Sequence, residues 1–396
     1  MTQATRGLFV ARLDIAQPHL SGVVKKVSAQ IDAMQEALGP VDFWCLNGLA
    51  VECNGTVVSR QPAGFAARKR LHALRFYKTV LQSAATADYV YIRYQRCTPV
   101  FLRFLARLKA QAPDRPIFVE LPTYPYDREY VTPRDRILGA VDRITRRGLA
   151  RHVDRIVTFS AAPEIFGIPT VGTDNGVNLT DIPVCTPMAE PPLRLVGVAN
   201  LGLRHAYDRV IDGLAAYRDA AMDTTLGTST GTDTGRQRQV VFDIVGMGAH
   251  EPILRAHAAR VGLLDKGVQF LGSLTGAALD AQMARGHIGI SGLGMHRIGT
   301  DTSDIKSREY CARGLPFVIA NADPDFGPDF TYAFHAPKDD TPLDIPAVLG
   351  FFDGLQASAI DYPQMMRHYA EANLTWRAKL APVIAAIDAA IRKPQG

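Results

Sequence analysis

The sequence predicts an α/β protein built from two doubly wound domains. Apolar runs of strand length alternate with amphipathic stretches of helix length in both halves of the 396-residue chain. Glycine-containing turns end many of these runs, as strand-to-helix connections usually do. Residues 183–192 contain four prolines and separate the two halves. We therefore expect one domain at 1–182, a linker at 183–192, a second domain at 193–365, and a terminal helix at 366–396.

Composition restricts the class of protein. Hydrophobic residues make up 47% and charged residues 21% of the chain, which is typical of soluble globular domains. No apolar run reaches the roughly 20 residues that a membrane-spanning helix needs, and the first run lacks the pattern of a signal peptide. Five cysteines without a CxxC pair favour a reducing cytoplasm and indicate neither disulfides nor a metal site. The net charge of +5 is too small to indicate a nucleic-acid partner.

The first domain opens with a strand at 7–13, a turn that includes Gly22, and a helix that stops at Gly39. Gly22 is a candidate for close approach of the backbone to a phosphate, although most glycines at such places only make turns. Further strands are expected at 41–46, 89–94, 116–121 and 154–160, with a helix at 100–108. These elements predict a sheet whose strands are mainly parallel.

A loop rich in tyrosine and proline follows the strand at 116–121. It lies at the carboxyl end of a parallel strand, where doubly wound folds bind ligands. Glu120, Asp127 and Glu129 are therefore acid/base candidates, and the alternative interpretation is a rigid connector whose tyrosines cover the core.

The second domain repeats the alternation, with strands at 193–198, 240–245, 268–271 and 287–291 and helices at 207–217 and 250–261. Arg204, His205 and Arg209 stand where the first of these strands passes into its helix. Gly246 and Gly248 form a GxG turn after the second strand, a weak signal because any tight turn favours glycine. Residues 222–239 are rich in Thr, Gly and Ser and are expected to be a surface insertion.

A short helix at 303–313 followed by a buried strand at 315–320 organises this domain. Ser303 is a suitable N-cap and Gly314 a suitable stop. Lys306, Glu309 and Arg313 share one face by their spacing. That face is either solvated, with a weak Glu309–Arg313 pair, or the wall of a binding site.

The run Glu309-Tyr310-Cys311-Ala312-Arg313-Gly314-Leu315-Pro316 resembles the donor site of retaining GT-B glycosyltransferases of the family-4 type. The resemblance implies two domains facing a cleft, with the last helix returning to the N-terminal domain. It implies that Glu309 accepts hydrogen bonds from the ribose of a nucleotide sugar and that the helix after Ser303 faces the diphosphate. No cofactor and no essential metal are expected. The text around His296 and Arg297 resembles a bacterial branch that assembles surface polysaccharides.

Loop positions and the resemblance together give the full set of candidates. Residues expected to bind the donor are Gly22, Arg204, His205, Arg209, Gly246, Gly248, Arg297, Ser303, Lys306 and Glu309. Residues expected to take part in catalysis are Glu120, Asp127, His296 and Asp301.

The function that follows is transfer of a sugar from a nucleotide donor to a glycan or lipid-linked acceptor, with retention implied by the resemblance alone. Two alternatives stay open: a GT-B sugar-nucleotide epimerase, and a nonenzymatic nucleotide-binding scaffold. Arginines crowd residues 134–155, and lysines and arginines crowd residues 68–78. These are either solvated helix faces or a peripheral contact with anionic lipid at the inner face of the cell membrane.

Overall fold

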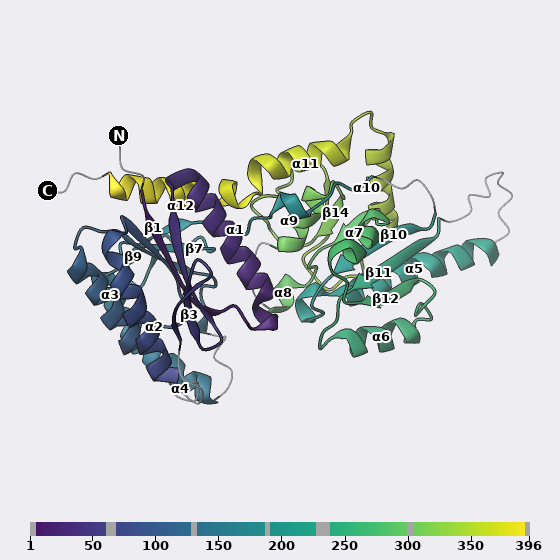
Figure 1. The fold of residues 1–396 in the computed structure, drawn as a ribbon. Coiled ribbons are helices and arrows are strands. Elements are labelled where there is room, and N and C mark those ends of the chain that lie inside the picture. Colours follow the sequence, from purple (N-terminus) through teal and green to yellow (C-terminus); the bar gives the residue numbers. More distant parts are fainter. Residues whose placement is uncertain are drawn as a thin grey trace. The chain divides into compact units, whose positions relative to one another are not determined.

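The computed structural model describes residues 5–60, 69–127, 133–186, 191–226, 238–298 and 304–392. The chain forms two compact units. The first comprises Met1–Asp174 together with Trp376–Gly396, and the second comprises Asn175–Thr375. Each unit holds a mainly parallel sheet between helices, which confirms the predicted α/β class (Figure 1). No helix in the described part of the chain is both long and apolar enough to cross a membrane.

The sheet of the first unit has nine strands in the order β4-β3-β2-β1-β5-β6-β7-β9-β8. The strands are β1 (Gly7–Asp14), β2 (Val41–Asn47), β3 (Ala50–Cys53), β4 (Thr56–Arg60), β5 (Tyr89–Arg93), β6 (Ile117–Leu121), β7 (Arg155–Thr158), β8 (Glu164–Ile165) and β9 (Ile168–Gly172). The centre of the sheet is parallel, and β3, β4 and β8 add antiparallel edges. The β3–β4 hairpin lies outside the predicted elements.

Helices cover both faces of this sheet. They are α1 (Ser21–Leu38), α2 (Lys69–Ser83), α3 (Pro99–Gln111), α4 (Pro133–Thr145) and α12 (Trp376–Ile391). Side chains alternate along β1: Phe9 faces a core shared with α1 and α12, whereas Leu8 and Val10 face a core shared with α2 and α3. The last helix of the chain therefore belongs to the first unit.

The sheet of the second unit has six parallel strands in the order β12-β11-β10-β13-β14-β15. The strands are β10 (Leu193–Val198), β11 (Val240–Val245), β12 (Val268–Gly272), β13 (Ile288–Ile290), β14 (Phe317–Ile319) and β15 (Ala333–His335). The helices are α5 (Tyr207–Leu226), α6 (Glu251–Arg260), α7 (Gly276–Ala284), α8 (Met295–Ile298), α9 (Ile305–Ala312), α10 (Ile345–Ala357) and α11 (Tyr362–Asn373).

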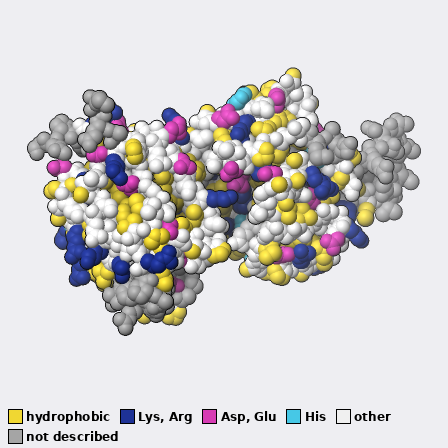
Figure 2. All heavy atoms as spheres, in the orientation of Figure 1, with side chains coloured by type: hydrophobic (Ala, Val, Ile, Leu, Met, Phe, Trp, Pro, Cys, Tyr) yellow, Lys and Arg dark blue, Asp and Glu magenta, His cyan; other side chains and the backbone are white. Residues whose placement is uncertain are grey.

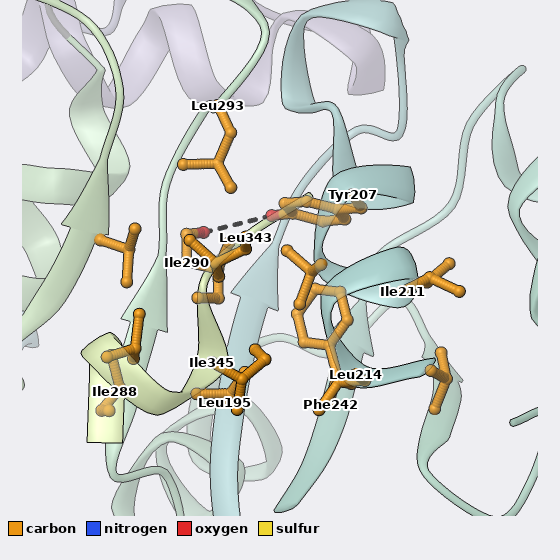
Figure 3. Close-up of a cluster of buried hydrophobic side chains, with 14 of the residues drawn as sticks. Leu195, Tyr207, Ile211, Leu214, Phe242, Ile288, Ile290, Leu293, Leu343 and Ile345 are labelled. Carbon is orange, nitrogen blue, oxygen red and sulfur yellow. Dashed lines mark hydrogen bonds between the residues drawn. The ribbon is translucent and has the colours of Figure 1, made fainter. Parts of the chain in front are cut away.

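One face of this second sheet packs on α5, α6 and α10 through a large apolar core (Figure 3). Tyr207 reaches across it and donates a hydrogen bond to the carbonyl oxygen of Ile290 (3.3 Å), so the start of α5 is joined to the end of β13. The other face packs on α9 and α11 through a separate core that includes Tyr310 and Met366.

The borders between the units differ from the predicted domain borders. The predicted linker at 183–192 and the predicted turning point at 366 both lie inside the second unit. The physical reason is α11, which packs on the second sheet through Met366 and Ala370. Its Arg367 also donates to the carbonyl oxygens of Ile182 (2.8 Å) and Ala312 (3.1 Å). The chain re-enters the first unit at Trp376.

Candidate functional site

The sheet order of the second unit defines a switch point between β10 and β13. From β10 the chain passes through α5 to β11 and β12 on one side, and returns through α7 to β13 on the other side. In open parallel sheets, ligands bind outside the carboxyl ends of the strands where the winding direction changes. The connections that leave these ends are the 199–206 loop, the 291–294 loop, α8 and the start of α9.

The 199–206 loop presents Arg204 and buries His205. The His205 Nδ1 atom accepts a hydrogen bond from the backbone N–H of Gly202 (3.0 Å). Burial, reinforced by the charges of Lys306 and Arg204, lowers the pKa of His205 to about 4, so the ring is neutral at pH 7. The carbonyl oxygens of Arg204 and His205 accept from the backbone of the 291–294 loop, which ties the two loops together.

Asp304 organises the 291–294 loop and the start of α9. It is the N-cap of α9, and its carboxylate also accepts from the Ser291 hydroxyl (3.0 Å) and the Gly292 N–H (3.1 Å). Burial raises the pKa of Asp304, but the Lys306 ammonium at 2.8 Å and these hydrogen bonds outweigh it and lower the pKa to about 2. The predicted cap was Ser303, which lies outside the described residues. The N-cap is the next residue, Asp304. Its carboxylate accepts from the Lys306 backbone N–H and also from the Lys306 ammonium.

The rest of α9 is held by buried arginines. Arg308 is fully buried and pairs with Asp323 (2.9 Å) and Asp325 in the loop after β14. Arg313 pairs with Asp280 (2.6 Å) of α7, which differs from the surface pair of the solvated alternative. Tyr310 is buried as well. Lys306 and Glu309 are half-buried.

Arg297 lies in α8 beside two carboxylates. Its guanidinium donates to both oxygens of Asp208 (2.8 and 2.7 Å) and to Asp340 (2.6 Å). Hydrogen bonds to Asp208, followed by those to Asp340, raise the pKa of Arg297 above its ordinary value despite burial. His296 donates from Nε2 to the Asp340 carboxylate (3.0 Å), and its Nδ1 is a buried atom without a hydrogen-bond partner in the described structure.

Arg209 has a structural role. It is 1% exposed, and it donates to the carbonyl oxygens of Thr341 (2.7 Å), Leu293 (2.8 Å) and Pro337 (3.0 Å). Because its N–H groups donate to backbone carbonyl oxygens, including that of Leu293, Arg209 supports the 291–294 loop. It is not a surface cation.

Gly246 and Gly248 permit close packing of two loops. A Cβ atom at Gly246 would stand 1.8 Å from the carbonyl oxygen of Ala199, and Gly246 has φ +120°. A Cβ atom at Gly248 would stand 2.3 Å from the carbonyl oxygen of Leu201. The glycines therefore let the loop after β11 lie against the 199–206 loop.

The first unit has a corresponding switch point between β1 and β5. Asp14 at the end of β1 accepts from Gln17, Ala16 and Gly48, which joins the loops after β1 and β2. Arg12 and His72 lie near one another here, and burial followed by the charge of Arg12 lowers the pKa of His72. Arg12 and His72 were not among the predicted residues, although Arg12 stands at the end of the first strand, where such a group could have been sought.

Gly22 lies in the first turn of α1, with open space around the position of a Cβ atom. The steric argument that applies to Gly246 therefore does not apply there.

Glu120 is completely buried between β5 and α1. It accepts from Tyr91 (2.8 Å) and Gln30 (3.1 Å) and pairs with Arg93. Nearby, burial lowers the pKa of Lys26 to about 8, and the Lys26 ammonium lies 3.9 Å from the centre of the Phe159 ring. The carboxylate of Glu120 is therefore enclosed and cannot reach a substrate.

Asp127 is an accessible carboxylate of the loop after β6. It pairs with Arg143 (2.9 Å) and Arg146 (3.3 Å). Beside it, the fully buried Asp142 accepts from Tyr126 of this loop (2.8 Å) and from Tyr94, which follows β5 (2.6 Å), so Tyr126 belongs to a structural network. Asp301 and Glu129 lie outside the described residues.

A cavity of about 690 Å³ lies at the amino ends of β5, β6 and β7 in the first unit. Both cations and carboxylates line it, including Arg115, Arg155, Asp88 and Asp154. We favour the carboxyl ends as the site, because functional loops of parallel sheets lie there. Among described residues, no group of three or more His, Cys, Asp or Glu side chains is arranged to hold a metal ion.

Comparison with known proteins gives the fold. No protein-family profile and no curated protein matches the sequence. A glycosyltransferase from Rickettsia africae ESF-5 is similar in structure, with TM-score 0.60 and 12% identity over 99% of this chain and 100% of that chain. The lipopolysaccharide outer core galactosyltransferase WaaB in its apo form is also similar, with TM-score 0.53 and 12% identity over 97% of this chain and 99% of that chain.

A third similar structure is an α,α-trehalose-phosphate synthase (UDP-forming) from Burkholderia vietnamiensis, with TM-score 0.55 and 14% identity over 99% of this chain and 100% of that chain. These proteins share the GT-B fold, and at such low identity the similarity establishes the fold alone. The protein is thus a GT-B fold protein with the two parallel-sheet units that this fold requires.

Proposed function

We propose that this protein is a glycosyltransferase that transfers a sugar from a nucleoside-diphosphate donor to a glycan or lipid-linked acceptor. One observation carries the proposal: in a GT-B fold, Arg204 lies on a loop at the switch point of the second unit, and α9, which begins beside that loop, carries Lys306 and Glu309. Two cations suit a diphosphate, and a carboxylate suits the hydroxyls of a ribose.

Each group has a separate role in the donor site. Arg204 is exposed and has no carboxylate partner within the described residues. The Lys306 ammonium gives two hydrogen bonds to Asp304, which leaves one of its three N–H groups for a phosphate oxygen. Glu309 accepts from the ribose. Arg297 is a weaker candidate than the sequence predicts, because Asp208 and Asp340 already compensate its charge.

The proposal extends to catalysis and to the acceptor. His296, whose side chain is 20% exposed and pairs with Asp340, and Asp301 are the proposed acid/base candidates. Retention of configuration, independence from an essential metal and a role in surface polysaccharide assembly rest on the sequence resemblance. The acceptor is assigned to the first unit, where Arg12 and His72 suit a polar or anionic group. The proposed location is the cytoplasm, at the inner face of the cell membrane.

Calorimetric titration tests the donor assignment. UDP-, GDP- and ADP-linked sugars and the free diphosphates are titrated into wild type, Arg204→Gln, Lys306→Gln and Arg285→Gln. Arg285 is an exposed cation that follows α7. It lies just before β13, at the amino ends of the strands and so away from the candidate site, and it serves as the matched control. We expect one nucleotide to bind, with about tenfold or greater loss for each site variant and none for the control. Absence of binding by every nucleotide, or equal losses for the control, contradicts the proposal.

A further inference from the structure

Helix α4 of the first unit exposes its apolar residues. Ile137 is 69% exposed, Val141 37% and Ile144 72%. They are spaced i, i+4 and i+7, so they form one stripe along the helix. Exposed apolar side chains are common singly, but a continuous stripe indicates an interaction surface.

The buried side of α4 explains why the stripe faces outward. Asp142 is completely buried and accepts hydrogen bonds from Tyr94 (2.6 Å), the Cys97 N–H (2.6 Å) and Tyr126 (2.8 Å). Turning the helix to bury Ile137 and Ile144 would remove a carboxylate from these donors. The polar network therefore fixes the helix with its apolar side exposed, which reverses the usual amphipathic arrangement.

Exposed cations lie on α4 itself, on the segment that follows it and on the neighbouring helix α3. Arg136 on α4 and Arg147 and Arg151 just after it are exposed, and no ion pair of theirs to a carboxylate occurs among the described residues. Arg103 and Arg107 add two exposed cations on α3, which packs beside the segment through the contact of Leu102 with Gly148. Figure 2 shows Lys and Arg side chains gathered over α3. Arg143 and Arg146, by contrast, are paired with Asp127.

We propose that α4 docks on an anionic lipid bilayer, with Ile137, Val141 and Ile144 inserted into the interface and the exposed arginines on the lipid phosphates. Apolar insertion together with basic residues is the combination that gives reversible interfacial binding. The arginines favour a bilayer over a second copy of this chain, because two copies would bring like charges together. This stripe would be the surface by which the protein binds at the proposed membrane location, and such binding does not require glycosyl transfer.

Vesicle flotation with the full chain tests the proposal. Phosphatidylcholine vesicles with and without one-third phosphatidylglycerol are compared for wild type, I137S/I144S, R147Q/R151Q and I360S. Ile360 is 55% exposed in the second unit and is the matched control for loss of an exposed isoleucine. We expect wild type and I360S to bind the anionic vesicles, about tenfold or greater weakening in both double variants, and little binding to pure phosphatidylcholine.

Three results would overturn the proposal: no binding of wild type to anionic vesicles, unchanged binding of I137S/I144S, or a dimer in sedimentation that I137S/I144S dissociates while vesicles stay unbound. Circular dichroism melting checks that the variants fold. Nucleotide titration of I137S/I144S separates this inference from the proposed function, because donor affinity should not change.

Discussion

Replacing Asp304 by asparagine removes a buried charge from the centre of the candidate donor site. Asp304 is 8% exposed, and Lys306, Ser291 and Gly292 all donate to its carboxylate. Its pKa falls from 3.8 to about 2 on folding. At 1.36 kcal/mol per unit, this difference corresponds to about 2 kcal/mol of folding free energy at pH 7. We expect Asp304→Asn to lower the free energy of unfolding by about 2 to 3 kcal/mol. Part of the loss arises because the new asparagine NH₂ group faces hydrogen-bond donors that the carboxylate accepted.

The pH dependence gives the sharper test. A carboxylate with a lowered pKa stabilises the folded state above the unfolded pKa of 3.8, and this stabilisation decreases as the pH falls toward 2. The difference in free energy of unfolding between wild type and Asp304→Asn should therefore reach its maximum at pH 7 and be roughly half as large at pH 3. Urea unfolding followed by circular dichroism measures it. The two tryptophans, Trp44 and Trp376, both lie in the first unit, so their fluorescence is an internal control. A loss below about 0.5 kcal/mol, or one that is equal at both pH values, would refute the reasoning.

Two further predictions concern the loops beside this site. Gly246→Ala should destabilise the second unit by several kcal/mol or prevent its folding, because the new Cβ atom meets the Ala199 carbonyl oxygen at 1.8 Å and φ is +120°. Gly22→Ala, with nothing near its Cβ position, should leave thermal stability unchanged or slightly raised; equal losses for the two variants would contradict the packing argument. His205 has a pKa lowered from 6.5 to about 4, so protonation of the unfolded chain removes stability as the pH falls below 6.5. Between pH 7 and pH 5 the free energy of unfolding of wild type should fall by about 2 kcal/mol more than that of His205→Asn. Urea unfolding that gives the same decrease for both proteins would contradict this.

Much of the architecture could be predicted because its signals are local. The strand-to-helix order follows from apolar runs and their turns, and β10 and β11 have the bounds that the periodicity predicts. Gly39 and Gly314 end their elements as expected, and both have positive φ. The β3–β4 hairpin was missed although its Asn54-Gly55 turn is a strong local signal for one.

The side-chain partners could not be predicted, because they come from distant parts of the sequence. The spacing of Arg308 and Arg313 in the helix does not indicate that they are buried. Their ion-pair partners, Asp323 and Asp280, come from other segments of the chain. The outward stripe on α4 likewise depends on the donors to Asp142, two of which are tyrosine hydroxyls from other elements. Spacing gives which residues share a helix face, but the direction of that face depends on tertiary contacts.

The site residues were predicted from both periodicity and resemblance, and the structure separates them by environment. Arg204 is exposed and Lys306 is half-buried at the carboxyl ends of the strands, whereas Arg209 and His205 are enclosed within the supporting loops. Sequence position alone does not distinguish an exposed cation from one that donates to three carbonyl oxygens.

Glu309 is the residue whose replacement tests the donor site most directly. The measurement is kcat/KM for the donor in Glu309→Gln, together with the melting temperature of the ligand-free protein. Glu371→Gln is the matched control, because Glu371 is a half-exposed carboxylate on α11 of the same unit. If Glu309 accepts two charge-assisted hydrogen bonds from ribose, each contributes roughly 1.5–3 kcal/mol, and glutamine retains one acceptor. The account predicts a loss of roughly ten- to several-hundred-fold in kcat/KM for a variant that still folds, and wild-type turnover in the control. Full turnover in Glu309→Gln would contradict the account.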